Sequence, residues 1–194
     1  MAGRRRDIGG GSLAARVAGW PRKGIVRSIQ RGSITLTAGL TTATATITAV
    51  SLANAVIAWS GNTYDAASGD FALNQGRIRL TNATTVTANR NTAGNVLILG
   101  FEVIEYWPGI VRQVQHDIIS VAGASATYTI TPAVRSIERT SVRHLGVSSN
   151  VASNANPTDH LVRVVVTNTT TVTATRGAAA AGTSVVSICV VEWF

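Results

Sequence analysis

Residues 81–90 read TNATTVTANR and residues 167–176 read TNTTTVTATR, so eight of ten positions are identical. A second motif repeats in the same way, because residues 24–30 read GIVRSIQ and residues 109–115 read GIVRQVQ. The offset between the copies drifts only from 85 to 87 residues. A fixed period of this length is typical of a duplicated structural unit. The sequence therefore predicts two similar units in tandem.

The two units alternate polar and apolar side chains with a period of two, which is the period of a strand. Threonine alternates with alanine or isoleucine over residues 42–49, and a similar pattern returns over residues 125–131. Asn82-Ala83 and Asn168-Thr169 separate strand-like runs, so each pair marks a tight hairpin. About six strands fit into each unit, and no amphipathic helical pattern competes. We therefore expect an all-β fold of two tandem antiparallel β-sandwich modules with a jelly-roll-like arrangement, with a flattened barrel as the alternative for each module.

These patterns divide the chain into a leading segment, residues 1–23, and two modules, residues 24–107 and residues 108–194. Pro108 marks the boundary between the modules, and so short a linker predicts that they touch. Long polar loops are expected at matching places, because residues 60–76 and residues 146–160 are rich in Gly, Asn, Ser and Asp.

Positive charge is concentrated near the N-terminus. The net charge is +8, and residues 1–27 hold seven basic residues against Asp7, which places +6 there and +2 in the rest. We interpret residues 1–23 as a flexible basic arm that docks in an acidic groove of a protein partner. A solubilising tail and contact with nucleic acid are the alternative interpretations. The residues expected to dock are Arg4, Arg5, Arg6, Leu13, Arg16, Val17, Trp20, Arg22 and Lys23.

Three features favour docking on protein over contact with nucleic acid. The two modules add little positive charge, and aromatic residues make up only 5% of the chain. These aromatic residues are not interleaved with the arginines, as a base-stacking surface requires. In addition, Leu13, Val17 and Trp20 give the arm apolar anchors.

Two charged pairs repeat on faces that are otherwise apolar. At the start of each module, Arg27 and Arg112 fall on the same strand face as isoleucine and valine residues. At the end of each module, Glu105 and Glu192 fall on the apolar face of the last strand. A charge on such a face tends to be paired. We predict that the first and last strands of a module are neighbours, with structural ion pairs Arg27–Glu105 and Arg112–Glu192. The alternative is that these charges lie in water at strand ends.

The sequence holds no recognisable catalytic or metal-binding pattern. His116, His144 and His160 have no counterparts in the other module and no metal-ligand spacing, and the acidic residues are scattered. Cys189 lies in an apolar run and is expected to be a small buried side chain. No apolar run reaches the length of a membrane span. We therefore expect a non-enzymatic protein with no cofactor, no metal and no membrane contact.

Four segments in the two modules carry a family resemblance. They are VRSIQRGSI at residues 26–34, ATATITAV at residues 43–50, RLTNATTVTA at residues 79–88 with the later Arg90, and VVEW at residues 190–193. Together they resemble small β-sandwich modules in structural proteins of tailed bacteriophages. The resemblance covers residues 24–194 but not the arm. The second module departs from it at His116-Asp117, where the first has Arg31-Gly32.

The resemblance implies a virion component without enzymatic activity that is assembled in the host cytoplasm. Its partners would be other virion proteins, either the major capsid protein or tail and collar proteins, in many copies or as a homo-oligomer. Among these roles we favour decoration or cementing of the capsid. The alternatives are a tail, collar, baseplate or fibre-attachment component and, in another class, a carbohydrate-binding or adhesion module. In the last case, Trp59 and Tyr64 would stack on a sugar ring.

Overall fold

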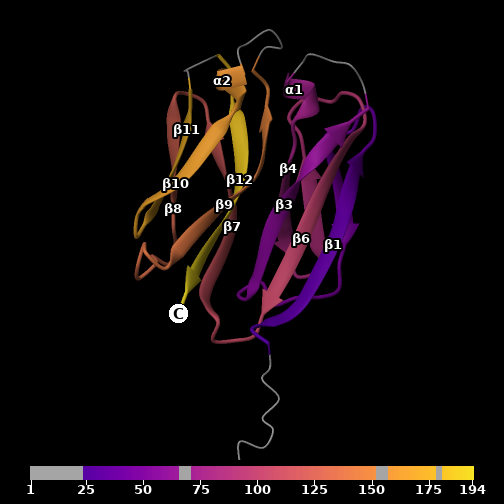
Figure 1. The fold of residues 1–194 in the computed structure, drawn as a ribbon. Coiled ribbons are helices and arrows are strands. Elements are labelled where there is room, and N and C mark those ends of the chain that lie inside the picture. The colour runs from indigo at the N-terminus through magenta and orange to yellow at the C-terminus, as the bar shows by residue number, and fades with distance from the viewer. Residues whose placement is uncertain (1–23, 66–70, 152–156, 178–180) are drawn as a thin grey trace, which may run out of the picture.

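The computed structural model describes residues 24–65, 71–151, 157–177 and 181–194. Most of these residues lie in strands, and every strand pair is antiparallel (Figure 1). Within the described ranges, helix is limited to the single turns α1 (Phe71–Asn74) and α2 (Pro157–His160). The expected all-β character is therefore confirmed.

The described residues form twelve strands, six in residues 24–107 and six in residues 108–194. We call these two parts of the chain the first half and the second half. The strands of the first half are β1 (Val26–Leu36), β2 (Thr42–Thr46), β3 (Ala55–Tyr64), β4 (Arg77–Asn82), β5 (Thr85–Asn89) and β6 (Leu97–Tyr106). The strands of the second half are β7 (Val111–Val121), β8 (Ser125–Thr129), β9 (Thr140–Ser149), β10 (Val162–Asn168), β11 (Thr171–Arg176) and β12 (Ser184–Trp193).

The two halves pair their strands in the same order. In the first half, β6 lies between β1 and β3, and β5 lies between β2 and β4. In the second half, β12 lies between β7 and β9, and β11 lies between β8 and β10. The first and last strands of each half are therefore neighbours, as the sequence predicted.

Alternating apolar side chains fill the space between the sheets of each half. Along β6, every second residue from Leu97 to Val103 is buried, which is the pattern of a strand with one face toward a core. Phe101 of β6 belongs to one apolar cluster with Val86 of β5. In the second half, Ile188 of β12 and Val172 of β11 belong to the corresponding cluster.

The repeated decapeptides form the β4–β5 and β10–β11 hairpins. Asn82 Oδ1 accepts hydrogen bonds from the Thr84 backbone N–H at 2.9 Å and from the Thr84 hydroxyl at 3.1 Å. Asn168 Oδ1 accepts the same two hydrogen bonds from Thr170 at 2.8 Å and 2.9 Å. Asparagine thus closes each turn through its side chain, which is why this residue marks the hairpin in the sequence. Both predicted hairpins are confirmed.

The polar loops expected at residues 60–76 and residues 146–160 are shorter than predicted. β3 continues to Tyr64 and β9 continues to Ser149, because each strand passes through a bulge that contains a glycine with positive φ. The φ angle is 100° at Gly61 and 87° at Gly146, values that glycine adopts without steric penalty.

The two halves lie side by side, and the second half covers an open edge of the first half (Figure 1). β9 contacts both β3 and β4. Arg77 of β4 pairs with Gly146 of β9, which joins the sheets β2-β5-β4 and β9-β12-β7. Leu145, Cys189 and Val191 of the second half belong to the core cluster of the first half. We call this contact surface between the halves the seam, and it agrees with the expectation that the short linker brings them together.

Cys189 is fully buried at the seam, as expected of a small side chain in an apolar run. Burial is the main cause that raises the pKa of the Cys189 thiol to about 12. The rings of Tyr106 and Trp193, the last residues of β6 and β12, meet edge to face with centroids 5.2 Å apart. Apolar and aromatic contacts therefore hold the halves together.

Replacing Gly146 with alanine is expected to weaken the seam. A Cβ atom at this position would lie 2.3 Å from Gly76 O, and a positive φ costs alanine about 1 kcal/mol in addition. Gly61→Ala is the matched control, because no atom of the described residues lies within 4 Å of its Cβ position. Urea unfolding should give the larger loss in free energy of unfolding for Gly146→Ala. Equal losses would contradict the close approach of β4 to β9.

Candidate functional site

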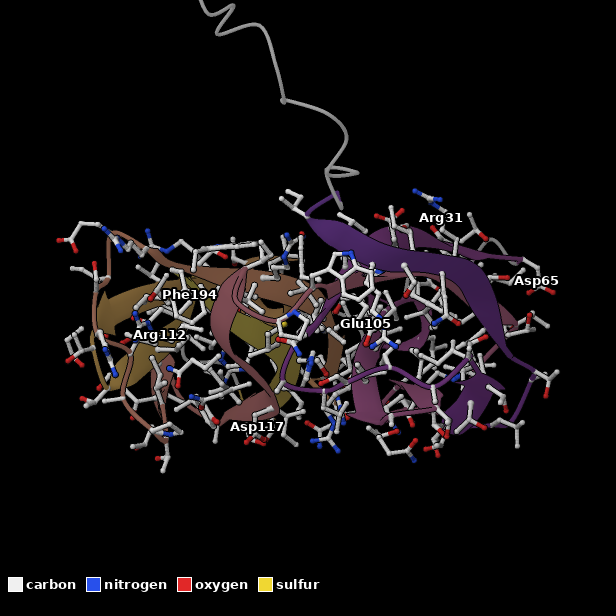
Figure 2. The ribbon with its side chains drawn as sticks, turned by 90° about the horizontal axis from the view of Figure 1, so that it is seen from below. Arg31, Asp65, Glu105, Arg112, Asp117 and Phe194 are labelled. Atoms are coloured by element: carbon white, nitrogen blue, oxygen red, sulfur yellow. The ribbon has the colours of Figure 1, made fainter. Side chains whose placement is uncertain are left out.

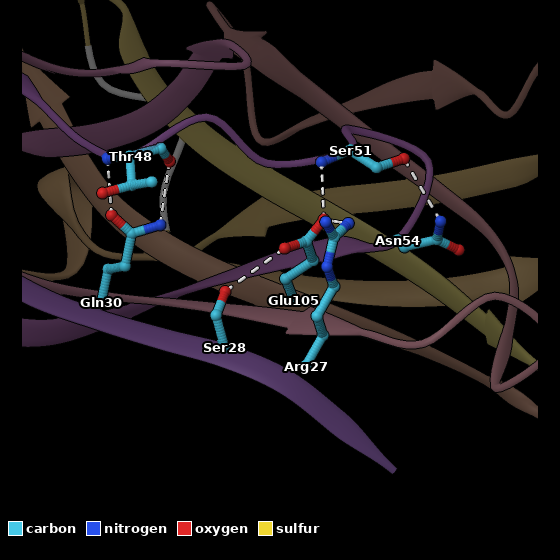
Figure 3. Close-up of polar contacts among 7 residues, drawn as sticks. All are labelled: Arg27, Ser28, Gln30, Thr48, Ser51, Asn54 and Glu105. Atoms are coloured by element: carbon cyan, nitrogen blue, oxygen red, sulfur yellow. Dashed lines mark hydrogen bonds and ion pairs between the residues drawn. The ribbon is translucent and has the colours of Figure 1, made fainter. Parts of the chain in front are cut away.

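Glu105 connects three segments of the first half near the end of β6 (Figure 3). The residue is 3% exposed. Its Oε1 accepts hydrogen bonds from Arg27 Nη1 and from the Ser51 backbone N–H, both at 2.9 Å, and its Oε2 accepts one from the Ser28 hydroxyl at 3.3 Å. The structure thus brings together the predicted pair of Arg27 and Glu105. The same carboxylate also fixes the loop that leads into β3.

Glu192 holds the matching place in the second half with a different set of donors. Its Oε1 accepts hydrogen bonds from the backbone N–H groups of Arg135 at 2.7 Å and Ser136 at 3.2 Å. Arg112 Nε lies 3.9 Å from Oε2. The structure therefore also brings Arg112 and Glu192 together. Two backbone N–H groups donate to Glu192, whereas one donates to Glu105. Such charge-assisted hydrogen bonds are strong.

The two arginines of these pairs also lie over aromatic rings at the end of each half. The guanidinium carbon of Arg27 is 5.5 Å from the ring centroid of Trp107, and that of Arg112 is 4.7 Å from the ring centroid of Phe194. Figure 2 shows Arg112 beside Phe194 in the second half. These cation–π contacts were not predicted, although both halves end in a glutamate followed by two aromatic residues, at residues 105–107 and residues 192–194.

Arg90 and Arg176 are buried arginines for which sequence analysis predicted no role. They end the two repeated decapeptides and are 3% and 5% exposed. Each guanidinium donates hydrogen bonds to backbone carbonyl oxygens of two or more loops, at 2.5 to 3.1 Å in the first half and 2.7 to 3.3 Å in the second. The acceptors are Thr37, Leu40, Gly94 and Asn95 for Arg90, and Ala122, Gly123, Asp159 and Gly182 for Arg176.

Replacing Arg90 with leucine is expected to lower the free energy of unfolding by roughly 3 kcal/mol or more, because four carbonyl oxygens each lose the hydrogen bond from its guanidinium. Arg90→Lys should recover only part of the loss, since an ammonium group lacks the planar fork. Arg135→Leu is the matched control, because the Arg135 side chain is exposed. Chemical denaturation measures all three. A loss for Arg90→Leu no larger than that for Arg135→Leu would contradict the structural role of Arg90.

Polar side chains complete the seam. Arg77 Nε donates a hydrogen bond to Ser148 Oγ at 3.1 Å, and Arg79 Nη1 lies 3.9 Å from Asp117 Oδ1. His116 Nε2 lies 3.0 Å from Ala55 O. Because a carbonyl oxygen only accepts, the imidazole donates from Nε2. Its Nδ1 is buried and has no hydrogen-bond partner in the described part of the chain.

Acid is expected to destabilise the protein through His116. Burial is the main cause that lowers its pKa from 6.5 to about 4; the hydrogen bond to Ala55 O opposes the shift and the charge of Arg79 adds to it. Between these two pH values the unfolded chain binds more protons, so stability is complete above about pH 6.5 and is lost toward pH 4, by up to about 3 kcal/mol.

Urea unfolding at pH 7.5 and at pH 4.5 measures this loss. His116→Gln should lose less stability than the parent chain over the same interval, because the amide does not titrate there. Equal losses in the two proteins would show that other groups account for the acid sensitivity.

A cavity of about 440 Å³ also opens at the seam, lined in part by Trp59, His144, Gln75 and Leu161. Trp59 is half-buried, and its ring lies tilted against that of His144 with centroids 6.1 Å apart. Tyr64 is 49% exposed. Trp59 is therefore engaged in packing between the halves, which weakens the interpretation that Trp59 and Tyr64 form a platform for a sugar ring.

Among the residues that the structure describes, no group of three or more His, Cys, Asp or Glu side chains is placed to hold a metal ion. His160, the last residue of α2, is fully buried. In the same ranges, no helix has the length and apolar character needed to cross a membrane.

The residues predicted to dock on a partner lie outside the described residues, because the arm comprises residues 1–23. The described chain begins beside two exposed apolar side chains. Ile25 is 61% exposed and Ile29 is 44% exposed. Both residues follow residues 1–23 closely in the sequence.

Comparisons with known protein families, with curated proteins and with solved structures found no match to this chain. In both halves, the repeated charged residues connect strand ends and loops: Glu105 and Glu192 as acceptors, Arg90 and Arg176 as donors.

Proposed function

We propose that this chain is a non-enzymatic structural protein of a tailed-phage particle, which decorates or cements the capsid surface. The observation that carries the proposal is the uneven charge of the chain, because residues 1–27 hold +6 of the net +8. In this proposal, residues 1–23 dock in an acidic groove of the capsid protein. The all-β body then covers the junctions between capsid subunits, in many copies per particle.

We also propose that residues 24–107 and residues 108–194 are copies of one jelly-roll-like β-sandwich module. In both halves the first strand pairs with the last and the second pairs with the penultimate. This is the order in which a jelly roll folds a long hairpin upon itself. The repeated decapeptide forms the same hairpin in each half. Duplication of one module accounts for both the shared motifs and the shared order.

The positions of the repeated charged residues support a non-enzymatic role. Glu105 and Glu192 are nearly fully buried and accept hydrogen bonds from backbone N–H groups. Arg90 and Arg176 donate to backbone carbonyl oxygens. Catalytic acids and bases need access to a substrate. These four side chains are instead engaged in holding the fold together.

The character of the arm supports docking on a protein partner. Arginines in this segment provide charge for an acidic groove, and Leu13, Val17 and Trp20 provide apolar contacts. Ile25 and Ile29 add two exposed apolar side chains close to this segment in the sequence. Many copies on a symmetric particle multiply a modest affinity through effective concentration.

Removing charge from the arm is expected to weaken docking. Arg5→Ala/Arg6→Ala should bind particles that lack this protein about tenfold more weakly than the parent chain, which corresponds to about 1.4 kcal/mol. Arg135→Ala/Arg139→Ala removes the same charge from exposed positions of the body and should bind like the parent. Co-sedimentation with the particles measures both. Equal binding by the two variants would contradict docking through the arm.

Two further measurements separate the alternatives to this proposal. Tight binding to duplex DNA that collapses between low and moderate salt would favour contact with nucleic acid. Mass spectrometry of separated heads and tails assigns the chain to one compartment and counts its copies. Its recovery with tails would favour a tail, collar or baseplate component over capsid decoration.

A further inference from the structure

The seam joins two different surfaces, so it is a head-to-tail contact. The first half contributes the open edge between β3 and β4, which we call its edge groove. The second half contributes the outer side of its β7-β12-β9 sheet, which we call its sheet face. Leu145, Cys189 and Val191 of this sheet face lie in the core cluster of the first half. Each half therefore retains one surface that the seam does not use.

The edge groove of the second half is uncovered. In the first half, Ile57 and Leu80 line the groove and are at most 2% exposed. Their counterparts in the second half, Val142 and Val166, are only half-buried and line an apolar hollow of about 430 Å³. Val165 also lines this hollow and is 41% exposed. The same strand positions are thus covered in one half and open in the other.

The sheet face of the first half, the outer side of β1-β6-β3, is uncovered as well. Cys189 and Val191 are fully buried at the seam. Their counterparts Glu102 and Ile104 are only half-buried. Ile98, on the same side of β6, is 38% exposed. The molecule therefore presents both surfaces that its own seam would need to form a second time.

The bulge glycines mark a further correspondence between the seam and the free sheet face. At the seam, a Cβ on Gly146 would meet Gly76 O and Arg77 Cα, because the start of β4 lies against this bulge. Gly61 occupies the matching bulge of the first half, where a hollow of about 290 Å³ lies open. β10 of a second copy begins at Val162 and can fill this hollow as β4 fills its counterpart.

A hydrogen bond of the seam can form again between copies. Arg77 Nε donates to Ser148 Oγ at 3.1 Å. The position that matches Arg77 is Arg163, and the position that matches Ser148 is Thr63. Both the guanidinium donor and the hydroxyl acceptor are therefore retained on the free surfaces, and both residues are exposed.

One ion pair of the seam has no counterpart on the free surfaces, because both of its residues are replaced there. Arg79 and Asp117 lie 3.9 Å apart at the seam. The matching positions are Val165 in the free edge groove and Gly32 beside the free sheet face. Because both charges are replaced together, contact between copies leaves neither partner of this pair buried alone.

One difference makes a contact between copies weaker than the seam. Arg31 and Glu102 form an ion pair on the free sheet face, where the second half has His116 and Cys189. Burying this pair carries a desolvation cost that the seam does not carry. Association is therefore expected to depend on protein concentration.

We propose that this chain binds further copies of itself head to tail. The edge groove of the second half of one copy receives the sheet face of the first half of the next, and this repeats the contact already present between the halves. Such a heterologous contact extends until a ring closes or a filament grows. This association requires no phage particle and does not depend on the proposed virion role.

Two single variants block the two free surfaces separately. Val165→Asp places a charge in the free edge groove, and Ile98→Glu places one on the free sheet face. These positions are 41% and 38% exposed, so the fold can accept the change. Thr127→Asp and Thr44→Glu, at exposed strand positions elsewhere, are the matched controls.

Sedimentation velocity of the full chain at rising concentration is the first measurement. The parent and the two controls should form dimers and larger species, while Val165→Asp alone and Ile98→Glu alone remain single chains. An equimolar mixture of the two should form two-chain complexes and nothing larger, because one intact groove then meets one intact sheet face. Association of Val165→Asp alone to the extent of the parent would overturn the proposal.

Crosslinking decides the matter if the parent sediments as a single chain at every concentration. A Thr63→Cys/Arg163→Cys variant should give a ladder of disulfide-linked multimers under oxidising conditions. A Thr63→Cys/Thr127→Cys variant is the matched control and should not. No more multimers from the first variant than from the control would overturn the proposal. Both measurements use the purified chain, so they are independent of docking on particles.

Discussion

Each half of this protein depends on contact between its two ends. Arg27 and Glu105 lie 78 positions apart, yet the carboxylate joins β1 to β6 from within the fold. Bringing distant ends together costs loop-closure entropy before the sheets can form. A buried carboxylate is tolerated only with its partners, and a slip of one residue would turn Glu105 to the other side of its strand. The closure therefore fixes the register as well as the topology.

The two halves share a sequence pattern, but residues at matching positions differ in how deeply they are buried. Along β12, Cys189 and Val191 have no exposed surface, whereas the matching β6 residues Glu102 and Ile104 are half-buried. The residue types follow this difference, because a charge stands where water has access and a thiol stands where it has none. The same strand pattern thus lies in unequal surroundings, inside the molecule in β12 and at its surface in β6.

The strand pattern was predictable because it depends on local periodicity and on contacts within one half. The hairpins at Asn82 and Asn168 and the neighbouring first and last strands all follow from such signals. The roles of Arg90 and Arg176 were not, since carbonyl oxygens of loops leave no pattern in a sequence. The surfaces that meet at the seam could not be predicted either, because a sequence repeat does not show which of several matching surfaces are in contact. In addition, β3 and β9 extend into the segments that composition predicted to be polar loops.

Cys189 gives the protein an internal reporter. It is the only cysteine in the sequence, it has no exposed surface, and its pKa of about 12 keeps the thiol protonated at neutral pH. Thiol reagents react with the thiolate, so they can modify this side chain only after the halves have parted and water has reached it. The rate of labelling in the native state therefore measures how often the protein opens far enough to expose the seam at β12.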